Sequence, residues 1–342
     1  MAEIELKIAK KEDSNEWDRI VNSSPHGTIF HTWKWLKITE KHSGKRLYPL
    51  MGYKGSELIG VYPLFSSRKY FLRMVFSPPP STGIPYLGIV LDKFDKLKQD
   101  KREVNFREFY NSAEKFIKSE LNANYVQISL SPGFIDARPF KWSGYNVEPV
   151  YHYLINLEKG EKSVWSGFKG SLRAHIKKAQ KEGITVKQGE KEEVKLLFNR
   201  LKERYAEQGR RIPMSKSYLL DIFKEFYPQN MRVFMAEYNG EYVGGIITLI
   251  FKEKILFWIG APKAKLKGLS PNDLVQWECI KWAIENGLKY YEEVGANTPR
   301  LCEFKSRYNP ELTICLTARK VTTITKLLEK IYRLYLRNMV EI

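Results

Sequence analysis

The most informative part of the chain is the segment from Gly268 to Leu312, GLSPNDLVQWECIKWAIENGLKYYEEVGANTPRLCEFKSRYNPEL. It predicts a helix, a short strand and a loop in succession. Ser270 has the residue type of a helix N-cap, Pro271 suits the first helical position, and Asp273 has the spacing of a capping box. An apolar stripe at helical spacing predicts that one face of this helix is buried. The stripe consists of Trp277, Ile280, Ile284 and Leu288.

Two adjacent carboxylates follow the predicted helix. Gly287 has the residue type that commonly ends a helix. Residues 288–294 then predict a short strand that carries Glu292 and Glu293. A loop leads to the pair Phe304-Lys305, which we expect in a further strand. Because side chains alternate along a strand, we expect Phe304 to enter the core while Lys305 faces a groove, or the reverse. Only the first arrangement places a cation where charge develops in a reaction.

These elements resemble the C-terminal part of the FemAB-like acyltransferases, a branch of the GNAT (N-acetyltransferase) fold. The family pattern is a proline at a helix start, Trp-Glu within that helix, an acidic residue with glycines after the next strand, and then Phe-Lys. The matching residues here are Pro271, Trp277-Glu278, Glu292 or Glu293, Gly295 and Phe304-Lys305. The family often has Asp followed by two glycines, whereas this chain has Glu292-Glu293-Val294-Gly295-Ala296. The acidic position therefore stays open between Glu292 and Glu293.

The resemblance extends more weakly over most of the 342 residues and implies an α+β (mixed α/β) fold of two GNAT-like domains in tandem. We expect an N-terminal domain at 1–155, a FemAB-like C-terminal domain at 156–319, and a helix at 320–342 that packs on the first domain. Two β-hairpins are predicted, with turns at Lys54-Gly55-Ser56 and Asn239-Gly240. Gly244-Gly245 predicts a bulge or a close backbone approach in the second hairpin.

The chain is strongly basic, with 57 Lys and Arg against 39 Asp and Glu and a net charge of +18. Such a field attracts polyanions, among them tRNA, CoA and anionic lipid surfaces. The densest cationic face lies on the helix that we expect Ser171 to cap, and it carries Arg173, Lys177 and Lys181. We predict that this face lines a polyanion-binding groove; the alternative is an ordinary solvated helix face.

Other features narrow the class of protein. The chain has no run of 18 apolar residues, and the segment MAEIELKIAKKEDS lacks the apolar region of a signal peptide. The three cysteines, Cys279, Cys302 and Cys315, lack metal-ligand spacing. We therefore expect a cytoplasmic protein without a metal or a resident cofactor. Its basic C-terminal helix could touch a membrane surface, although packing on a domain is the commoner arrangement.

The resemblance implies an acyltransferase that joins an activated acyl or aminoacyl donor to a primary amine. Residues 260–268, GAPKAKLKG, lack the Q/R-x-x-G-x-G/A pyrophosphate loop of acetyl-CoA-dependent GNAT enzymes. This departure fits the FemAB-like branch, whose peptidoglycan members use aminoacyl-tRNA, although acyl-CoA stays open as the donor. The alternative function is a non-catalytic GNAT-like module that binds tRNA or another polyanion. Phe304-Lys305 and the acidic strand end favour the enzyme.

Lys305 is the candidate cation for the oxyanion or the donor phosphate, and Glu292 or Glu293 could orient the amine or accept its proton. The alternative for Lys305 is an exposed surface lysine. We expect a nearby carboxylate to keep Lys305 protonated. The candidate substrate contacts are Phe304, Arg307, Arg173, Lys177, Lys181, Arg211 and Trp33. For Trp33, packing in the core is the simpler explanation.

Overall fold

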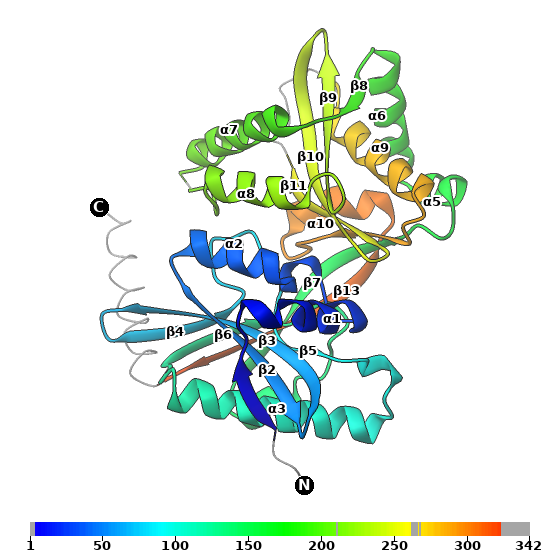
Figure 1. Ribbon diagram of the computed structural model, residues 1–342. Coiled ribbons are helices and arrows are strands. Elements are labelled where there is room, and N and C mark those ends of the chain that lie inside the picture. Colours follow the sequence, from blue (N-terminus) through cyan, green and yellow to red (C-terminus); the bar gives the residue numbers. More distant parts are fainter. Residues whose placement is uncertain (1–3, 210, 261–265, 267, 323–342) are drawn as a thin grey trace. The chain divides into compact units, whose positions relative to one another are not determined.

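A computed structural model describes residues 4–209, 211–260, 266 and 268–322 (Figure 1). The chain divides into two compact units, residues 1–149 with 315–342 (unit 1) and residues 150–314 (unit 2). The domain bounds predicted from the sequence, 1–155 and 156–319, differ from these units by a few residues at each join. The units are described separately below.

Unit 1 is a mixed sheet with helices on both faces. Its strands follow the order β1-β2-β3-β4-β6-β13, with β5 paired to β3. Only the β4–β6 pair is parallel among these described pairs. The strands are β1 (Glu5–Ile8), β2 (Arg46–Lys54), β3 (Glu57–Lys69), β4 (Leu72–Ser77), β5 (Val90–Leu91), β6 (Tyr125–Ser129) and β13 (Glu311–Val321). The helices are α1 (Ser14–Ser23), α2 (Trp33–Ser43), α3 (Gln99–Ser119) and α4 (Arg138–Trp142).

Helix α3 supplies the core of unit 1 on one face of the sheet, while α1 and α2 lie on the other face (Figure 1). Phe109 of α3 packs directly onto the backbone of the predicted β2–β3 hairpin. A Cβ atom on Gly52 would lie 2.5 Å from the Phe109 ring, and one on Gly60 would lie 3.1 Å from it. Glycine at these two positions therefore lets the ring reach the strands.

Unit 2 is also a mixed sheet, with the order β7-β12-β11-β10-β9-β8. Within it, β11 and β12 are parallel and the other described pairs are antiparallel. The strands are β7 (Asn146–Asn156), β8 (Thr185–Gln188), β9 (Met231–Tyr238), β10 (Glu241–Phe251), β11 (Lys254–Gly260) and β12 (Tyr290–Glu293). The helices are α5 (Glu161–Gly167), α6 (Gly170–Lys181), α7 (Lys191–Glu207), α8 (Lys216–Phe226), α9 (Pro271–Glu285) and α10 (Pro299–Lys305).

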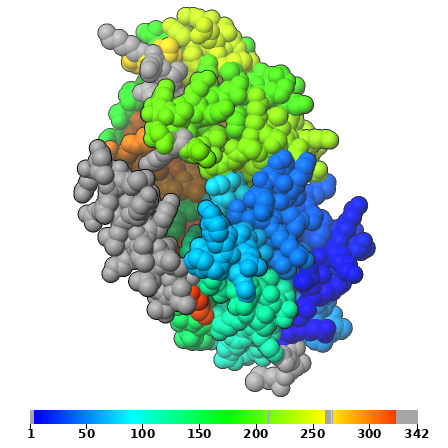
Figure 2. All heavy atoms as spheres, turned by 90° about the vertical axis from the view of Figure 1, so that its left-hand side faces the viewer, coloured from blue at the N-terminus to red at the C-terminus, as the bar shows by residue number. Residues whose placement is uncertain are grey.

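Strand β10 is sandwiched between two helix layers. A Cβ atom on Gly244 would lie 2.4 Å from Asn272 of α9, and one on Gly245 would lie 2.9 Å from Leu197 of α7. Successive side chains of a strand point to opposite faces, so α9 covers one face and α7 the other. Figure 1 shows the same two layers, and α7 and α8 form much of the green surface of unit 2 in Figure 2.

The hairpin predictions are confirmed. Asn239 and Gly240 both have positive φ, of 51° and 79°, at the turn between β9 and β10, as the favoured two-residue hairpin turn requires. The register of β9 and β10 shifts between Tyr242 and Gly244, which confirms the predicted bulge. The close approach of both neighbouring helices at Gly244 and Gly245 explains why two glycines stand there.

Three local predictions are wrong. Helix α6 begins at Gly170 with Lys169 at its N-cap, so Ser171 lies inside the helix. Asp273 does not cap α9, because its side chain turns toward Arg307 instead. Lys320 and Val321 belong to strand β13, so the C-terminal helix does not begin at Lys320. Residues 323–342, which hold the rest of that predicted helix, lie outside the described part of the chain.

Candidate active site

The candidate site lies where two parallel strands of unit 2 separate. The pairing of β11 with β12 ends at Phe257 and Glu293, while β11 continues to Gly260. Beyond this point, β11 still pairs with β10 on its other side. The backbone of β11 after Phe257 therefore has no partner in β12, and Glu293 is the last β12 residue before the opening.

Alternation along β12 sends Glu292 and Glu293 to opposite faces of the sheet. Both carboxyl groups are almost completely buried. Tyr291, which shares the face of Glu293, belongs to the core beneath α6 and α9. The two carboxylates that the sequence left equivalent therefore have different surroundings.

Glu293 is a buried acid with one oxygen unsatisfied. Its Oε1 atom accepts a hydrogen bond from the Gln276 side chain of α9, and its Oε2 atom has no hydrogen-bond partner among the described residues. Burial raises the pKa of Glu293 to about 7, although Lys305, Gln276 and Arg307 act in the opposite direction. A carboxyl group with this pKa exchanges its proton near neutral pH, as a general base does.

Glu292 is held as a structural anion on the other face. It lies 2.9 Å from Nζ of Lys254 and 3.4 Å from Nδ1 of the buried His152. Burial alone would raise the pKa of Glu292, but Lys254 and His152 outweigh it and lower the value to about 2. Glu292 therefore stays ionised at neutral pH, and the geometry favours Glu293 as the residue that handles a proton.

Lys305 does not lie on a strand. It is the last residue of α10, which begins with Thr298 as N-cap and Pro299 in the first turn. Lys305 is only 8% exposed, whereas Phe304 is half-buried, so Lys305 is the more buried of the two side chains and the surface-lysine alternative is wrong. Its ammonium donates to the carbonyl oxygens of Val294 and Gly295.

Burial lowers the pKa of Lys305, and the neighbouring Glu293 works against that effect by raising it. The expected carboxylate is thus present, but desolvation is the larger influence. The charge on Lys305 favours the ionised form of Glu293, and the charge on Glu293 favours the ionised form of Lys305. Proton binding by the two groups is therefore linked. The Lys305 ammonium has three N–H donors. The carbonyl oxygens of Val294 and Gly295 accept hydrogen bonds from two of them.

Arg307 connects this pair to α9. Its Nη2 atom lies 2.9 Å from Oδ1 of Asp273, and its guanidinium stacks 4.8 Å from the centre of the Phe304 ring. The Tyr308 hydroxyl lies 3.4 Å from the same Asp273 oxygen. Asp273 is 2% exposed, so its charge is neutralised inside the protein and not in solvent.

Sequence reasoning missed Asp273, Gln276 and His175 as members of this cluster. Nδ1 of His175 in α6 lies 3.4 Å from Oδ2 of Asp273. The one available signal was the polar pair Asp273 and Gln276 among the apolar residues of the first two turns of α9. A buried polar residue of this kind needs a partner, but the sequence does not say which one.

The predicted basic face is present on α6. Lys177 and Lys181 are exposed, and Arg173 is half-buried with a hydrogen bond of 3.3 Å to the Ser166 carbonyl. Arg211 is exposed in the loop between α7 and α8. Trp33 lies in unit 1 at the start of α2, where its ring makes an edge-on contact with Trp17 at 5.9 Å.

A cavity of about 510 Å³ lies beside Arg307, which is within the size range of small-ligand sites. It is lined by Gly167, Lys169, Glu303, Ser306, Arg307 and Asn309. The backbone N–H of Lys169 donates to the Arg307 carbonyl at 2.8 Å, which joins the start of α6 to the turn that follows α10. Arg307 and Lys169 therefore bring two cationic side chains to the wall of one cavity.

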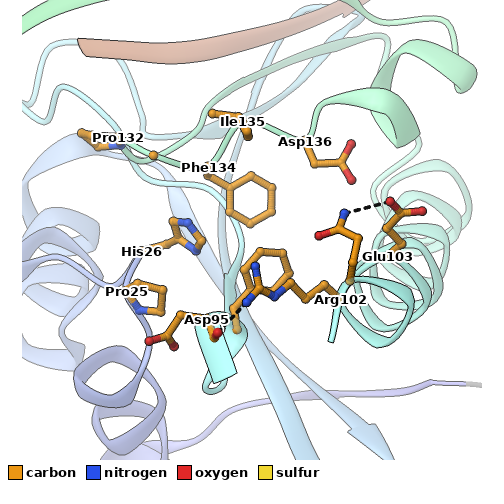
Figure 3. Close-up of a pocket in the computed structure, with 12 residues that line it drawn as sticks. Pro25, His26, Asp95, Arg102, Glu103, Pro132, Phe134, Ile135 and Asp136 are labelled. Carbon is orange, nitrogen blue, oxygen red and sulfur yellow. Dashed lines mark hydrogen bonds between the residues drawn. The ribbon is translucent and has the colours of Figure 1, made fainter. Parts of the chain in front are cut away.

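Unit 1 has a separate pocket, shown in Figure 3. His26, Phe94 and Phe134 pack their rings against one another inside it, with centroid distances of 4.8–5.7 Å. At the rim, Glu103 and Asp136 both bind Arg138. Because both carboxylates are already engaged by Arg138, we assign no step of the chemistry to this pocket.

Replacing Asp273 with Asn is expected to lower the free energy of unfolding by about 1–3 kcal/mol, because the largely buried Arg307 loses its counter-charge. Urea unfolding monitored by tryptophan fluorescence measures this. The matched control is Glu192→Gln, which removes the exposed Lys195–Glu192 pair and should change stability by no more than about 0.5 kcal/mol. Equal effects of the two variants would contradict the structural role of Asp273.

The described residues form neither a membrane span nor a metal-binding group. No helix among them is both long and apolar enough to cross a membrane. They also contain no group of three or more His, Cys, Asp or Glu side chains placed to hold a metal ion.

Residues 166–306 match the family model of the acetyltransferase (GNAT) domain. Several solved structures cover nearly the whole chain. FemX is 15% identical with a TM-score of 0.71, and the match covers 96% of this chain and 99% of FemX. L-PGS from Bacillus licheniformis is 14% identical with a TM-score of 0.55, and the match covers 92% of this chain and 94% of L-PGS. A tandem GNAT protein from the clavulanic acid biosynthesis pathway is 10% identical with a TM-score of 0.55, and the match covers 93% of this chain and 98% of that protein. No curated protein sequence matches significantly.

Residues 166–306 therefore form a GNAT acetyltransferase domain, and the chain as a whole has the fold of FemX and of the tandem GNAT protein. The match to the GNAT domain is the evidence that the protein is an acyltransferase. The solved structures are too low in sequence identity to show more than the fold. The predicted family, the mixed α/β fold class and the acyltransferase class are confirmed.

Proposed function

We propose that this protein forms an amide bond by transferring an acyl or aminoacyl group from an activated donor to a primary amine. The observation that carries the proposal is Glu293, a buried carboxyl group with a pKa of about 7 and an unsatisfied oxygen at the β11–β12 opening. A module that only binds polyanions has no use for such a group. The cation Lys305 beside it supplies the second component that acyl transfer needs.

In the proposed reaction the neutral amine attacks the acyl carbon, a C–N bond forms, and the carbonyl electron pair moves onto oxygen. Glu293 accepts the proton that the amine nitrogen loses. The Lys305 ammonium stabilises the oxyanion while it exists. The intermediate then collapses, the bond to the donor oxygen or sulfur breaks, and the proton held by Glu293 passes to that leaving group.

We propose an aminoacyl-tRNA as the donor in preference to acyl-CoA. Residues 260–268 lack the glycine-rich pyrophosphate loop, and most of them lie outside the described part of the chain. The exposed cations of α6, together with Arg307 and Lys169 in the adjoining cavity, offer a surface for a phosphate backbone. The net charge of +18 would speed the encounter with such a donor in the cytoplasm, where we place the protein.

If α6 binds a polyanion, the triple variant Arg173→Ala, Lys177→Ala, Lys181→Ala should bind tRNA more weakly and with a smaller salt dependence. Each phosphate contact contributes about 0.7 to 0.9 to the slope of log affinity against log salt concentration, so the slope should fall by about 2. Filter binding over a range of KCl concentrations measures it. A control that replaces the exposed Lys101, Lys115 and Lys118 of α3 with Ala should keep the wild-type slope. Unchanged tRNA binding by the α6 variant would return this face to ordinary solvated surface.

Mass spectrometry of reactions that pair aminoacyl-tRNAs or acyl-CoAs with candidate amines tests the proposed function directly. We expect a mass gain of one aminoacyl group on an amine acceptor with an aminoacyl-tRNA donor. Acyl transfer from CoA alone would overturn the donor assignment but keep the reaction. Binding of tRNA without transfer to any amine would favour the non-catalytic alternative.

A further inference from the structure

The turn of the β3–β4 hairpin exposes two aromatic side chains. Tyr70 and Phe71 stand between Lys69, the last residue of β3, and Leu72, the first residue of β4. Tyr70 is 81% exposed and Phe71 is 56% exposed. In Figure 1 the hairpin projects from the left side of unit 1. Two adjacent aromatic rings at the end of a hairpin cover no core of unit 1, so packing does not explain them.

The backbone at this turn is also strained. Tyr70 has a φ of +55°, in the left-handed region that bulky side chains rarely adopt. Two-residue hairpin turns normally place Gly, Asn or Asp at such a position, as Asn239 and Gly240 do in this same chain. A sequence that keeps tyrosine there accepts strain that glycine or asparagine would relieve, and strain of this kind marks sites of function.

The charges around the turn are a third unfavourable feature. Arg68 and Arg73 stand directly opposite each other in the β3–β4 register, where like charges destabilise a strand pair. Lys69 adds a third cation, 6.0 Å from the centre of the Tyr70 ring. The side chain of Asn124 holds the turn in place, since it accepts from the Arg73 N–H and donates to the Phe71 carbonyl, both at 3.0 Å.

The exposed aromatic rings and the facing cations would both be satisfied by one kind of partner, a surface that is apolar inside and negatively charged outside. We propose that the β3–β4 turn docks on an anionic lipid bilayer. Tyr70 and Phe71 enter the interface between headgroups and acyl chains, where aromatic rings concentrate. Arg68, Lys69 and Arg73 bind the lipid phosphates around them. This membrane contact does not depend on the proposed reaction.

Vesicle co-sedimentation tests the docking with the full chain. The wild-type protein should bind vesicles of equimolar phosphatidylcholine and phosphatidylglycerol, and it should bind pure phosphatidylcholine poorly. The double variant Tyr70→Asn, Phe71→Ser should bind the anionic vesicles about tenfold more weakly, because both apolar anchors are lost. The variant Arg68→Gln, Arg73→Gln should lose most of the salt-sensitive part of the binding.

Trp142 supplies a matched control, since it is 66% exposed in α4 and also lies beside an arginine. Trp142→Ser should bind vesicles like the wild type. Thermal unfolding separates docking from folding, because Tyr70→Asn relieves the backbone strain and should raise Tm by about 2 °C. Equal vesicle binding by the turn variants and the wild type would overturn the proposal and point to another contact. A wild-type dimer in solution that the turn variant dissociates would also overturn it, in favour of a second copy as the partner.

Discussion

Replacing Glu293 with Gln is expected to lower the turnover of amide formation by about two to four orders of magnitude, the usual contribution of a general base. Glutamine keeps the shape of the side chain and the contact with Gln276, but it cannot accept a proton. In the wild type, kcat/KM should fall as the pH drops below about 7, because Glu293 becomes protonated. This acid limb should be absent from the residual activity of the variant.

The same substitution should stabilise the protein at alkaline pH. The pKa of Glu293 is about 7 in the folded chain against an ordinary value of 4.5, so the folded state holds its proton more tightly than the unfolded state. Its contribution to stability is therefore complete below pH 4.5 and is lost as the pH rises through 7. Above pH 8, Glu293→Gln should unfold with a free energy about 3 kcal/mol higher than the wild type, and near pH 4.5 the two should agree.

Glu292→Gln is the matched control and should behave in the opposite way. The folded pKa of Glu292 is about 2, so its stabilisation is present above pH 4.5 and is lost as the pH falls toward 2. This variant should lose about 3 kcal/mol of stability at pH 7 and keep its turnover per folded molecule. Loss of turnover in Glu292→Gln with normal turnover in Glu293→Gln would reverse the assignment of the acidic position.

Lys305→Ala is expected to lower turnover by about two orders of magnitude, the effect of losing one oxyanion donor. The carbonyl oxygens of Val294 and Gly295 would lose their donor, so stability should also fall by about 1–3 kcal/mol. Activity must therefore be measured below the unfolding transition. The acid limb of kcat/KM should move to higher pH, because Lys305 lowers the pKa of Glu293 more strongly than Arg307 does.

Two further variants make the test of Lys305 specific. Lys305→Arg should restore the charge but only part of the turnover, since a planar guanidinium does not fit the compact position of an ammonium. Arg300→Ala removes an exposed cation from the same helix and should leave turnover and the pH profile unchanged. Near wild-type turnover in Lys305→Ala, together with an unmoved acid limb, would reduce Lys305 to a structural residue.

Local rules were enough to predict much of the fold. The Asn239-Gly240 turn, the proline at the start of α9 and the apolar stripe through Trp277 and Ile280 were all predicted correctly. Each of these features depends on residues that are close together in the sequence. Over such short distances, backbone geometry and burial follow directly from the residue types. One local signal gave no prediction here. Thr298-Pro299 has the residue types of a helix start, and the helix that begins there, α10, contains Lys305.

The sequence by itself therefore determined most of the elements, the resemblance to GNAT acyltransferases and the groups Glu292, Glu293 and Lys305, while the tertiary structure decided what each group does. Glu292 and Glu293 are equivalent in the sequence, yet one faces Lys254 and the other faces Lys305. Asp273 finds its partner Arg307 at a distance of 34 residues along the chain. Burial and through-space charge set the pKa of a side chain, and both depend on residues that only folding brings together.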